Sequence, residues 1–128
     1  MSYNIPDCKF DIMNADELLS TLTVKDGEVH VDVHKKAILT PFWNSDCIYD
    51  TKDVAEFFAD RVFAKERSDV KEILSLLNID EYNPFMIGKK THLHLYEDNV
   101  WIKFENEKIT WEKVQKEDLL YDTTIERI

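Results

Sequence analysis

Three valines at alternate positions constrain the fold of this chain most strongly. Val29, Val31 and Val33 alternate with His30, Asp32 and His34 in an uninterrupted run. Successive side chains of a β-strand point to opposite faces, and β-branched residues are enriched in strands. The run therefore predicts a strand with one buried valine face.

The segments around this strand predict a small sheet. Asp26-Gly27 is a tight-turn dipeptide directly before it, and a short strand over 37–39 would pair with it as a hairpin. Near the C-terminus, residues 92–96 alternate between polar and apolar. Further strands are expected over 93–95, 100–104 and 109–111, with a turn over 97–99, as a terminal β meander.

Helical spacing and capping residues predict the remaining elements. Asn14 and Glu17 resemble a capping box, which favours a helix over 15–23. The other predicted helices run from Thr51 to near Phe63, from Ser68 to near Asn78, and over 85–90 after an Asn83 N-cap and Pro84.

These elements together predict an α+β fold, with three to four short helices packed on one face of a small antiparallel sheet. The chain has 128 residues and only two glycines and three prolines, so no linker or repeat divides it. We expect one domain over residues 1–128.

The loop over 40–44 contains two large aromatic residues, Phe42 and Trp43. Rings of this size usually bury most of their area, so we expect them to pin the loop to the core. The alternative is that they are exposed and available to a partner.

The excess of acidic residues limits the partners of the chain. Asp and Glu number 26 against 16 Lys and Arg, which gives a net charge of −10 spread over both halves. Such a field repels phosphate backbones and anionic membranes, and its natural complement is a basic protein surface. The alternative interpretation is that the charge serves solubility alone.

The sequence gives two indications of compartment. The N-terminal stretch lacks the basic segment followed by an apolar segment that is typical of a signal peptide. No apolar run approaches the roughly 20 residues that span a membrane. Cys8 and Cys47 lie far apart without metal-knuckle spacing, so we expect reduced thiols. Both indications favour a cytoplasmic protein.

Catalytic and cofactor motifs are missing from the sequence. Neither a GxSxG turn nor a glycine-rich phosphate loop is present, so we expect neither enzymatic activity nor a cofactor.

Two histidine pairs are the only metal candidates, His30 with His34 and His92 with His94. Alternate residues share a strand face, so the four imidazoles could complete a tetrahedral shell and serve a metal-dependent enzyme. A solvated polar face explains the same pattern, and we favour it.

A basic joint lies between two predicted helices. Arg61 and Arg67 bracket it, and their planar guanidinium groups could clamp carboxylates or cap helix carbonyls. The alternative is that both form ion pairs with acids of this chain.

The joint, the turn Tyr82-Asn83-Pro84 and the strand segment 98–102 resemble the N-terminal region of HipA-like serine/threonine kinases of toxin–antitoxin systems. The resemblance covers about residues 49–104. The catalytic body of such kinases has no counterpart here, so no catalytic residue is carried over. The resemblance implies a free-standing relative of a non-catalytic segment that binds or regulates a partner.

We therefore expect a non-catalytic protein-binding or regulatory protein, of the toxin–antitoxin accessory kind. The alternative is a phage or mobile-element inhibitor of the anti-CRISPR or antirestriction type, whose carboxylates imitate a nucleic acid. Homodimerisation through a sheet edge stays open. The predicted partner-binding residues are Arg61, Arg67, Trp43, Trp101, Glu97 and Asp98.

Overall fold

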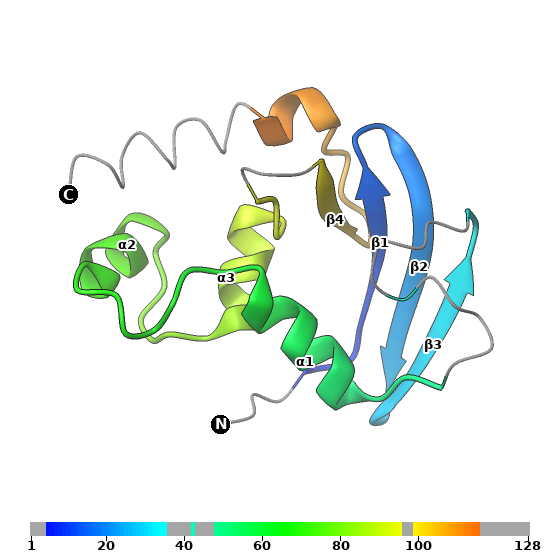
Figure 1. Ribbon diagram of the computed structural model, residues 1–128, viewed down its shortest axis with the longest axis horizontal. Helices are drawn as coiled ribbons and strands as arrows, with labels where there is room; N and C mark the ends of the chain where they lie inside the picture. Colours follow the sequence, from blue (N-terminus) through cyan, green and yellow to red (C-terminus); the bar gives the residue numbers. More distant parts are fainter. Residues whose placement is uncertain (1–4, 36–41, 43–47, 96–98, 116–128) are drawn as a thin grey trace.

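Four antiparallel strands and three helices form the framework of the protein, as a computed structural model describes it for residues 5–35, 42, 48–95 and 99–115 (Figure 1). The elements are β1 (Cys8–Asn14), β2 (Glu17–Lys25), β3 (Glu28–Val33), α1 (Thr51–Asp60), α2 (Val70–Leu76), α3 (Pro84–Thr91) and β4 (Val100–Phe104). The strand order in the sheet is β3-β2-β1-β4. This arrangement confirms the predicted α+β class.

The hairpin that joins β2 to β3 has the predicted turn. Asp26 and Gly27 both have positive φ, 53° and 79°, as a two-residue hairpin turn requires. Lys25 pairs with Glu28 across this turn. The valines of β3 are half-buried and face the same side as Leu22 and Val24 of β2, so the predicted strand is confirmed.

The prediction of a helix over 15–23 is wrong, because these residues form the turn at Ala15 and most of strand β2. A β-bulge explains the error. Ile12 pairs with Ser20 and Met13 with Leu18, which leaves Leu19 as an extra residue in β2. Leu19 and Leu22 are consequently both buried although they are three residues apart, a spacing typical of a helix.

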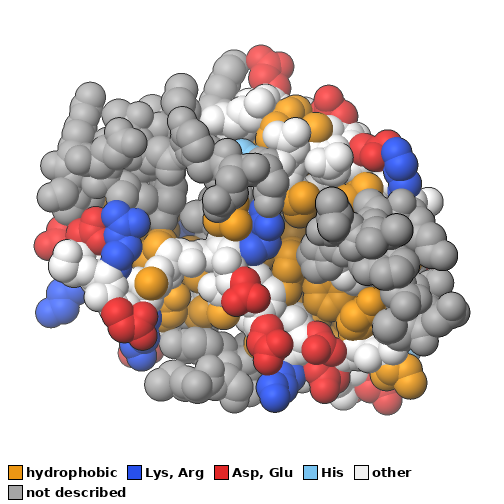
Figure 2. All heavy atoms as spheres, in the orientation of Figure 1, with side chains coloured by type: hydrophobic (Ala, Val, Ile, Leu, Met, Phe, Trp, Pro, Cys, Tyr) orange, Lys and Arg blue, Asp and Glu red, His pale blue; other side chains and the backbone are white. Residues whose placement is uncertain are grey.

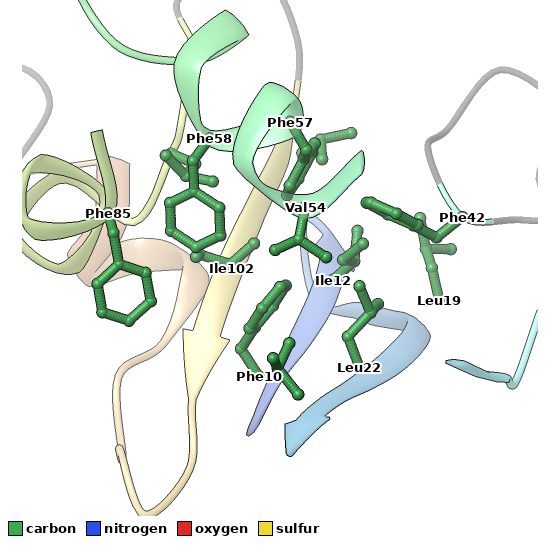
Figure 3. Close-up of a cluster of buried hydrophobic side chains, with 13 residues drawn as sticks. Phe10, Ile12, Leu19, Leu22, Phe42, Val54, Phe57, Phe58, Phe85 and Ile102 are labelled. Atoms are coloured by element: carbon green, nitrogen blue, oxygen red, sulfur yellow. The ribbon is translucent and has the colours of Figure 1, made fainter. Parts of the chain in front are cut away.

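A core of aromatic and aliphatic side chains fills the space between the sheet and the helices. Figure 3 shows Val54, Phe57 and Phe58 of α1 facing side chains of the sheet, with Phe85 of α3 beside them. Phe42 is only 5% exposed and lies edge to face against Phe57. The expectation that this aromatic pins its loop is confirmed; Trp43 lies outside the described residues.

Local capping explains where the helices begin. The N-cap of α1 is Asp50, one residue before the predicted Thr51, and Asp50 and Asp53 form a reciprocal capping box. The helix ends at Asp60 rather than near Phe63. At α3 the prediction is confirmed, since the Asn83 side chain accepts hydrogen bonds from the N–H groups of the first turn.

The prediction for α2 was close. The helix has its N-cap at Asp69, whereas Ser68 was expected to start it, and it ends at Leu76, two residues before the predicted end. Figure 1 places α2 farther from the sheet than α1 and α3.

Two of the predicted C-terminal strands are wrong. His92 and Leu93 have positive φ, 57° and 54°, so the chain turns there and residues 93–95 form no strand. Residues 111–115 are helical rather than extended, and the Thr110 hydroxyl accepts from the backbone N–H of Lys113. The strand over 100–104 is confirmed as β4. The expected strand over 37–39 and most of the expected turn over 97–99 lie outside the described residues.

A second, smaller core lies on the other face of the sheet. Trp101, Ile109 and Val114 are buried together, with Met13 and Trp111 packed against them. Because Trp101 pairs with Met13 and neighbours Ile102 of the main core, these side chains point away from α1 and α3. This cluster covers one end of that face.

Candidate functional site

A polar site lies on the sheet face opposite α1 and α3. A groove of about 450 Å³ runs across it. Its lining comes from β1, β2, β3 and β4 and the turn after β4: Lys9, Phe10, Asp11, Leu18, Thr21, Asp32, His34, Lys103, Phe104, Glu105, Asn106 and Glu107. We call this the open-face groove.

A chain of hydrogen bonds in the groove links β1 and β2 to the residue that follows β3. The Thr21 Oγ1 atom lies 2.7 Å from Asp11 Oδ1 and 2.9 Å from His34 Nε2. An ionised carboxylate only accepts, so the Thr21 hydroxyl donates to Asp11 and accepts from His34. This arrangement fixes the His34 tautomer with its proton on Nε2, and within the described residues the second Asp11 oxygen accepts no hydrogen bond.

Acidic groups outnumber basic ones in the groove. The lining contains the four carboxylates of Asp11, Asp32, Glu105 and Glu107 against the two ammonium groups of Lys9 and Lys103. The Asp32 side chain is 79% exposed, and His34 Nε2 lies 3.9 Å from its Oδ2 atom. Two carboxylates on separate strands, the partly buried Asp11 of β1 and the exposed Asp32 of β3, favour a cationic ligand.

The geometry of the groove is poorly suited to nucleophilic catalysis. A serine- or threonine-type nucleophile needs a base that accepts its proton, and that base needs a third group to orient it. Here the hydroxyl is the central member, between a carboxylate and an imidazole that donates to it.

The one described cysteine is also a weak nucleophile. Burial raises the pKa of the Cys8 thiol from 9.0 to about 11, and the nearby Asp7 carboxylate adds to the rise while Lys89 opposes it. The thiol is therefore protonated at neutral pH.

The Arg61 side chain forms hydrogen bonds to backbone carbonyls of the same chain. Its Nε donates to the Leu93 carbonyl at 2.7 Å and its Nη2 to the Val100 carbonyl at 2.9 Å. The guanidinium thus joins the end of α1 to the segment after α3 and to β4. Both acceptors are backbone carbonyls outside the helices, so this contact is not the helix-carbonyl cap expected as one possibility, and it directs the side chain inward.

Arg67 is bound locally as well. Its Nε lies 2.6 Å and its Nη2 3.0 Å from the two carboxylate oxygens of Asp69. Hydrogen bonds from Arg67 lower the pKa of Asp69, whose side chain is 17% exposed. The ion pair expected as an alternative is present for Arg67, and the two arginines do not form a common surface clamp.

The remaining predicted docking residues lie inside the fold or beyond the described ranges. Trp101 is 1% exposed, and its indole N–H donates to the Ala15 carbonyl at 2.8 Å. It therefore offers almost no surface to a partner, which corrects the sequence expectation. Trp43, Glu97 and Asp98 lie outside the described residues.

The four histidines do not converge. His30 is on the solvent side of β3, 71% exposed, while His92 is buried with its Nε2 3.0 Å from Glu107 Oε2. His94 lies edge to face against Trp111. Over residues 5–35, 42, 48–95 and 99–115, no three His, Cys, Asp or Glu side chains are grouped to hold a metal ion.

Sequence reasoning missed the groove because it missed β1 and assigned a helix to β2. A period-2 signal was present in both strands. Phe10 and Ile12 alternate with Lys9 and Asp11, and the β-branched Thr21 and Thr23 flank Leu22 in the same way. Two adjacent amphipathic strands predict one polar sheet face.

Comparison of the chain with protein-family models, with curated proteins and with solved structures found no match. Within the described ranges, every helix is too short or too polar to cross a membrane.

Proposed function

We propose that this chain is a non-catalytic protein-binding domain that docks a basic segment of its partner on the open face of its sheet. The observation that carries the proposal is the open-face groove itself. Helices α1 and α3 occupy one face of the sheet, and the opposite face presents a hollow with carboxylates on β1 and β3.

Charge supports a basic protein segment as the ligand. The net charge of −10 attracts cationic surfaces at long range, and the excess of carboxylates in the groove extends the attraction to contact distance. The apolar Leu18, 37% exposed, lies in the lining and offers a short hydrophobic contact within the polar surface.

A regulatory role of the toxin–antitoxin kind is part of this proposal, and it rests on the resemblance of residues 49–104 to a non-catalytic kinase segment. The resemblance supports binding rather than catalysis. The predicted cytoplasmic location is likewise an element of the proposal.

NMR titration with an arginine-rich decapeptide tests the site. We expect shifts of backbone amides in β1, β2 and β3. The double change Asp11→Asn with Asp32→Asn should weaken binding about fivefold or more, since exposed charge pairs each contribute about 0.2–1 kcal/mol. The matched control, Glu56→Gln with Asp60→Asn, removes the same charge from two exposed positions of α1 outside its capping box.

The proposal fails if the shifts map to α1, or if the two double variants weaken binding equally. The same pair of variants, used as baits in pull-downs from the native host, then tells which recovered proteins depend on the groove.

One observation favours a second candidate function, inhibition by imitation of a nucleic acid. Acidic side chains gather over α1 in Figure 2. Asp53, Glu56 and Asp60 follow one another at helical rises of about 4.5 and 6 Å, so they form a row of negative charges along one side of α1. An inhibitor of this type would bind through α1, so weaker binding of the α1 double variant to a basic host enzyme would identify it.

A further inference from the structure

A second concavity, of about 630 Å³, lies at the end of the sheet where β1 begins and β2 ends. Its lining comprises Asp7, Cys8, Lys9, Thr23, Val24, Lys25, Lys89, Phe104, Glu105 and Asn106. We call it the lysine cleft. Lys9 lines both this cleft and the open-face groove, whereas Lys25 and Lys89 line only the cleft.

The lysine cleft has a basic lining although the protein as a whole is acidic. In a chain with ten more acidic than basic residues, three lysines from three different elements line one hollow, against two carboxylates. None of the three makes an ion pair with a residue in the described ranges. Ammonium groups without a carboxylate partner are available to an anionic ligand.

Lys89 is positioned by aromatic rings rather than by an acid. Its Nζ lies 5.8 Å from the centroid of the Phe85 ring and 5.9 Å from that of Phe104. Cation–π contacts of this kind restrict the side chain without neutralising it. The charge of Lys89 therefore remains in the lining of the cleft.

The rest of the lining suits the same ligand. The Asp7 carboxylate already has a partner within the protein, because its Oδ1 atom accepts a hydrogen bond from the backbone N–H of Asp26 at 3.0 Å. The Cys8 thiol is neutral at physiological pH and adds no negative charge. Val24 and Phe104 supply an apolar wall, while Thr23 and Asn106 supply hydroxyl and amide groups.

We propose that the lysine cleft binds an oxyanion, a carboxylate or a phosphate, carried on a small molecule with a short apolar body. The three ammonium groups would contact the oxyanion and the apolar wall would contact the body. The cleft shares Lys9, Phe104, Glu105 and Asn106 with the open-face groove, but the proposal does not rest on the docking of a basic segment there.

Amide NMR titrations with inorganic phosphate, acetate and hexanoate, at constant ionic strength, test the proposal. We expect saturable shifts of the amides of Lys9, Lys25 and Asn106 in at least one titration. Tighter binding of hexanoate than of acetate would assign a carboxylate on an apolar body, and saturation by phosphate alone would assign a phosphate.

Lys89→Gln and Lys25→Gln should each weaken binding about threefold or more, as expected for one partly exposed charge pair. Lys71→Gln on the exposed side of α2 is the matched control, because it changes the net charge equally and lies outside the cleft. Absence of saturable shifts at millimolar ligand, or an equal loss in Lys71→Gln, would overturn the proposal.

Discussion

The Nη2 atom of Arg61 donates a hydrogen bond to the Val100 carbonyl at 2.9 Å, and so joins the C-cap residue of α1 to the outer edge of β4. Two more contacts follow along that edge. Ile102 donates its N–H to the His92 carbonyl at 2.8 Å, and Phe104 donates to Glu107 Oε1 at 2.7 Å. Side chains and loops thus occupy an edge that could otherwise pair with another chain.

Substitution of Arg61 should destabilise the protein much more than substitution of Arg67. Arg61→Ala leaves the carbonyls of Leu93 and Val100 without their charged donor, and we expect a loss of about 2–3 kcal/mol in the free energy of unfolding. Arg67→Ala breaks a partly exposed local ion pair and should cost about 1 kcal/mol or less. Urea denaturation measures both, and equal losses would contradict this assignment.

Gly88→Ala should destabilise α3, although alanine is normally the better helix former by about 1 kcal/mol. A Cβ atom at position 88 would lie 2.8 Å from Leu93 Cδ2 and from two ring atoms of Phe58. Overpacking of this kind typically costs about 1–3 kcal/mol. Thermal unfolding should show a lower Tm, whereas Ser75→Ala on the exposed side of α2 should leave it nearly unchanged.

Glu107 should be important for stability because its two oxygens serve two partners. Oε1 accepts from the Phe104 N–H, and Oε2 lies 3.0 Å from His92 Nε2. Glu107→Ala removes both acceptors and should cost about 1–3 kcal/mol for the partly buried groups left behind. Glu107→Gln keeps one acceptor oxygen, so a smaller loss in chemical denaturation is expected, and an equal loss would contradict the two-partner role.

The hydrogen-bond chain in the open-face groove predicts one tautomer for His34. Because Thr21 donates to Asp11, His34 must donate through Nε2. Long-range ¹H–¹⁵N spectra at pH 8 should show the Nε2–H form of His34, and Thr21→Val should change those signals. His30, which is 71% exposed and does not line the groove, is the internal reference. A His34 spectrum that Thr21→Val leaves unchanged would rule out this chain.

Particular residues show how far the sequence could predict this fold. The valines of β3, the Asp26-Gly27 turn and the Asn83-Pro84 helix start are local signals, and each was correct. Leu19 could not be interpreted locally, because a bulge that depends on pairing with β1 placed it in the core beside Leu22.

The candidate site was less predictable than the fold for the same reason. Asp11, Thr21 and His34 are 10 and 13 residues apart, and only the sheet register brings them together. Arg61 and Arg67 were conspicuous in the sequence, yet what they bind depends on tertiary contacts to Val100 and on the conformation at Asp69.

The Cys8 thiol should give the protein a distinctive alkaline pH dependence. Its pKa is raised from 9.0 to about 11, first by burial and then by Asp7. The folded state therefore holds this proton more tightly than the unfolded state. The stability that results is complete below about pH 9 and falls as the pH rises toward 11.

Thiol alkylation measures this dependence directly. In a Cys47→Ser background, reaction of Cys8 with iodoacetamide should be slow at pH 8 and should rise up to about pH 11. Lys89 is the opposing charge, so Lys89→Gln should move the midpoint to still higher pH, whereas Lys71→Gln should not. A midpoint near that of a free thiol would show that Cys8 is exposed rather than held in the wall of the lysine cleft.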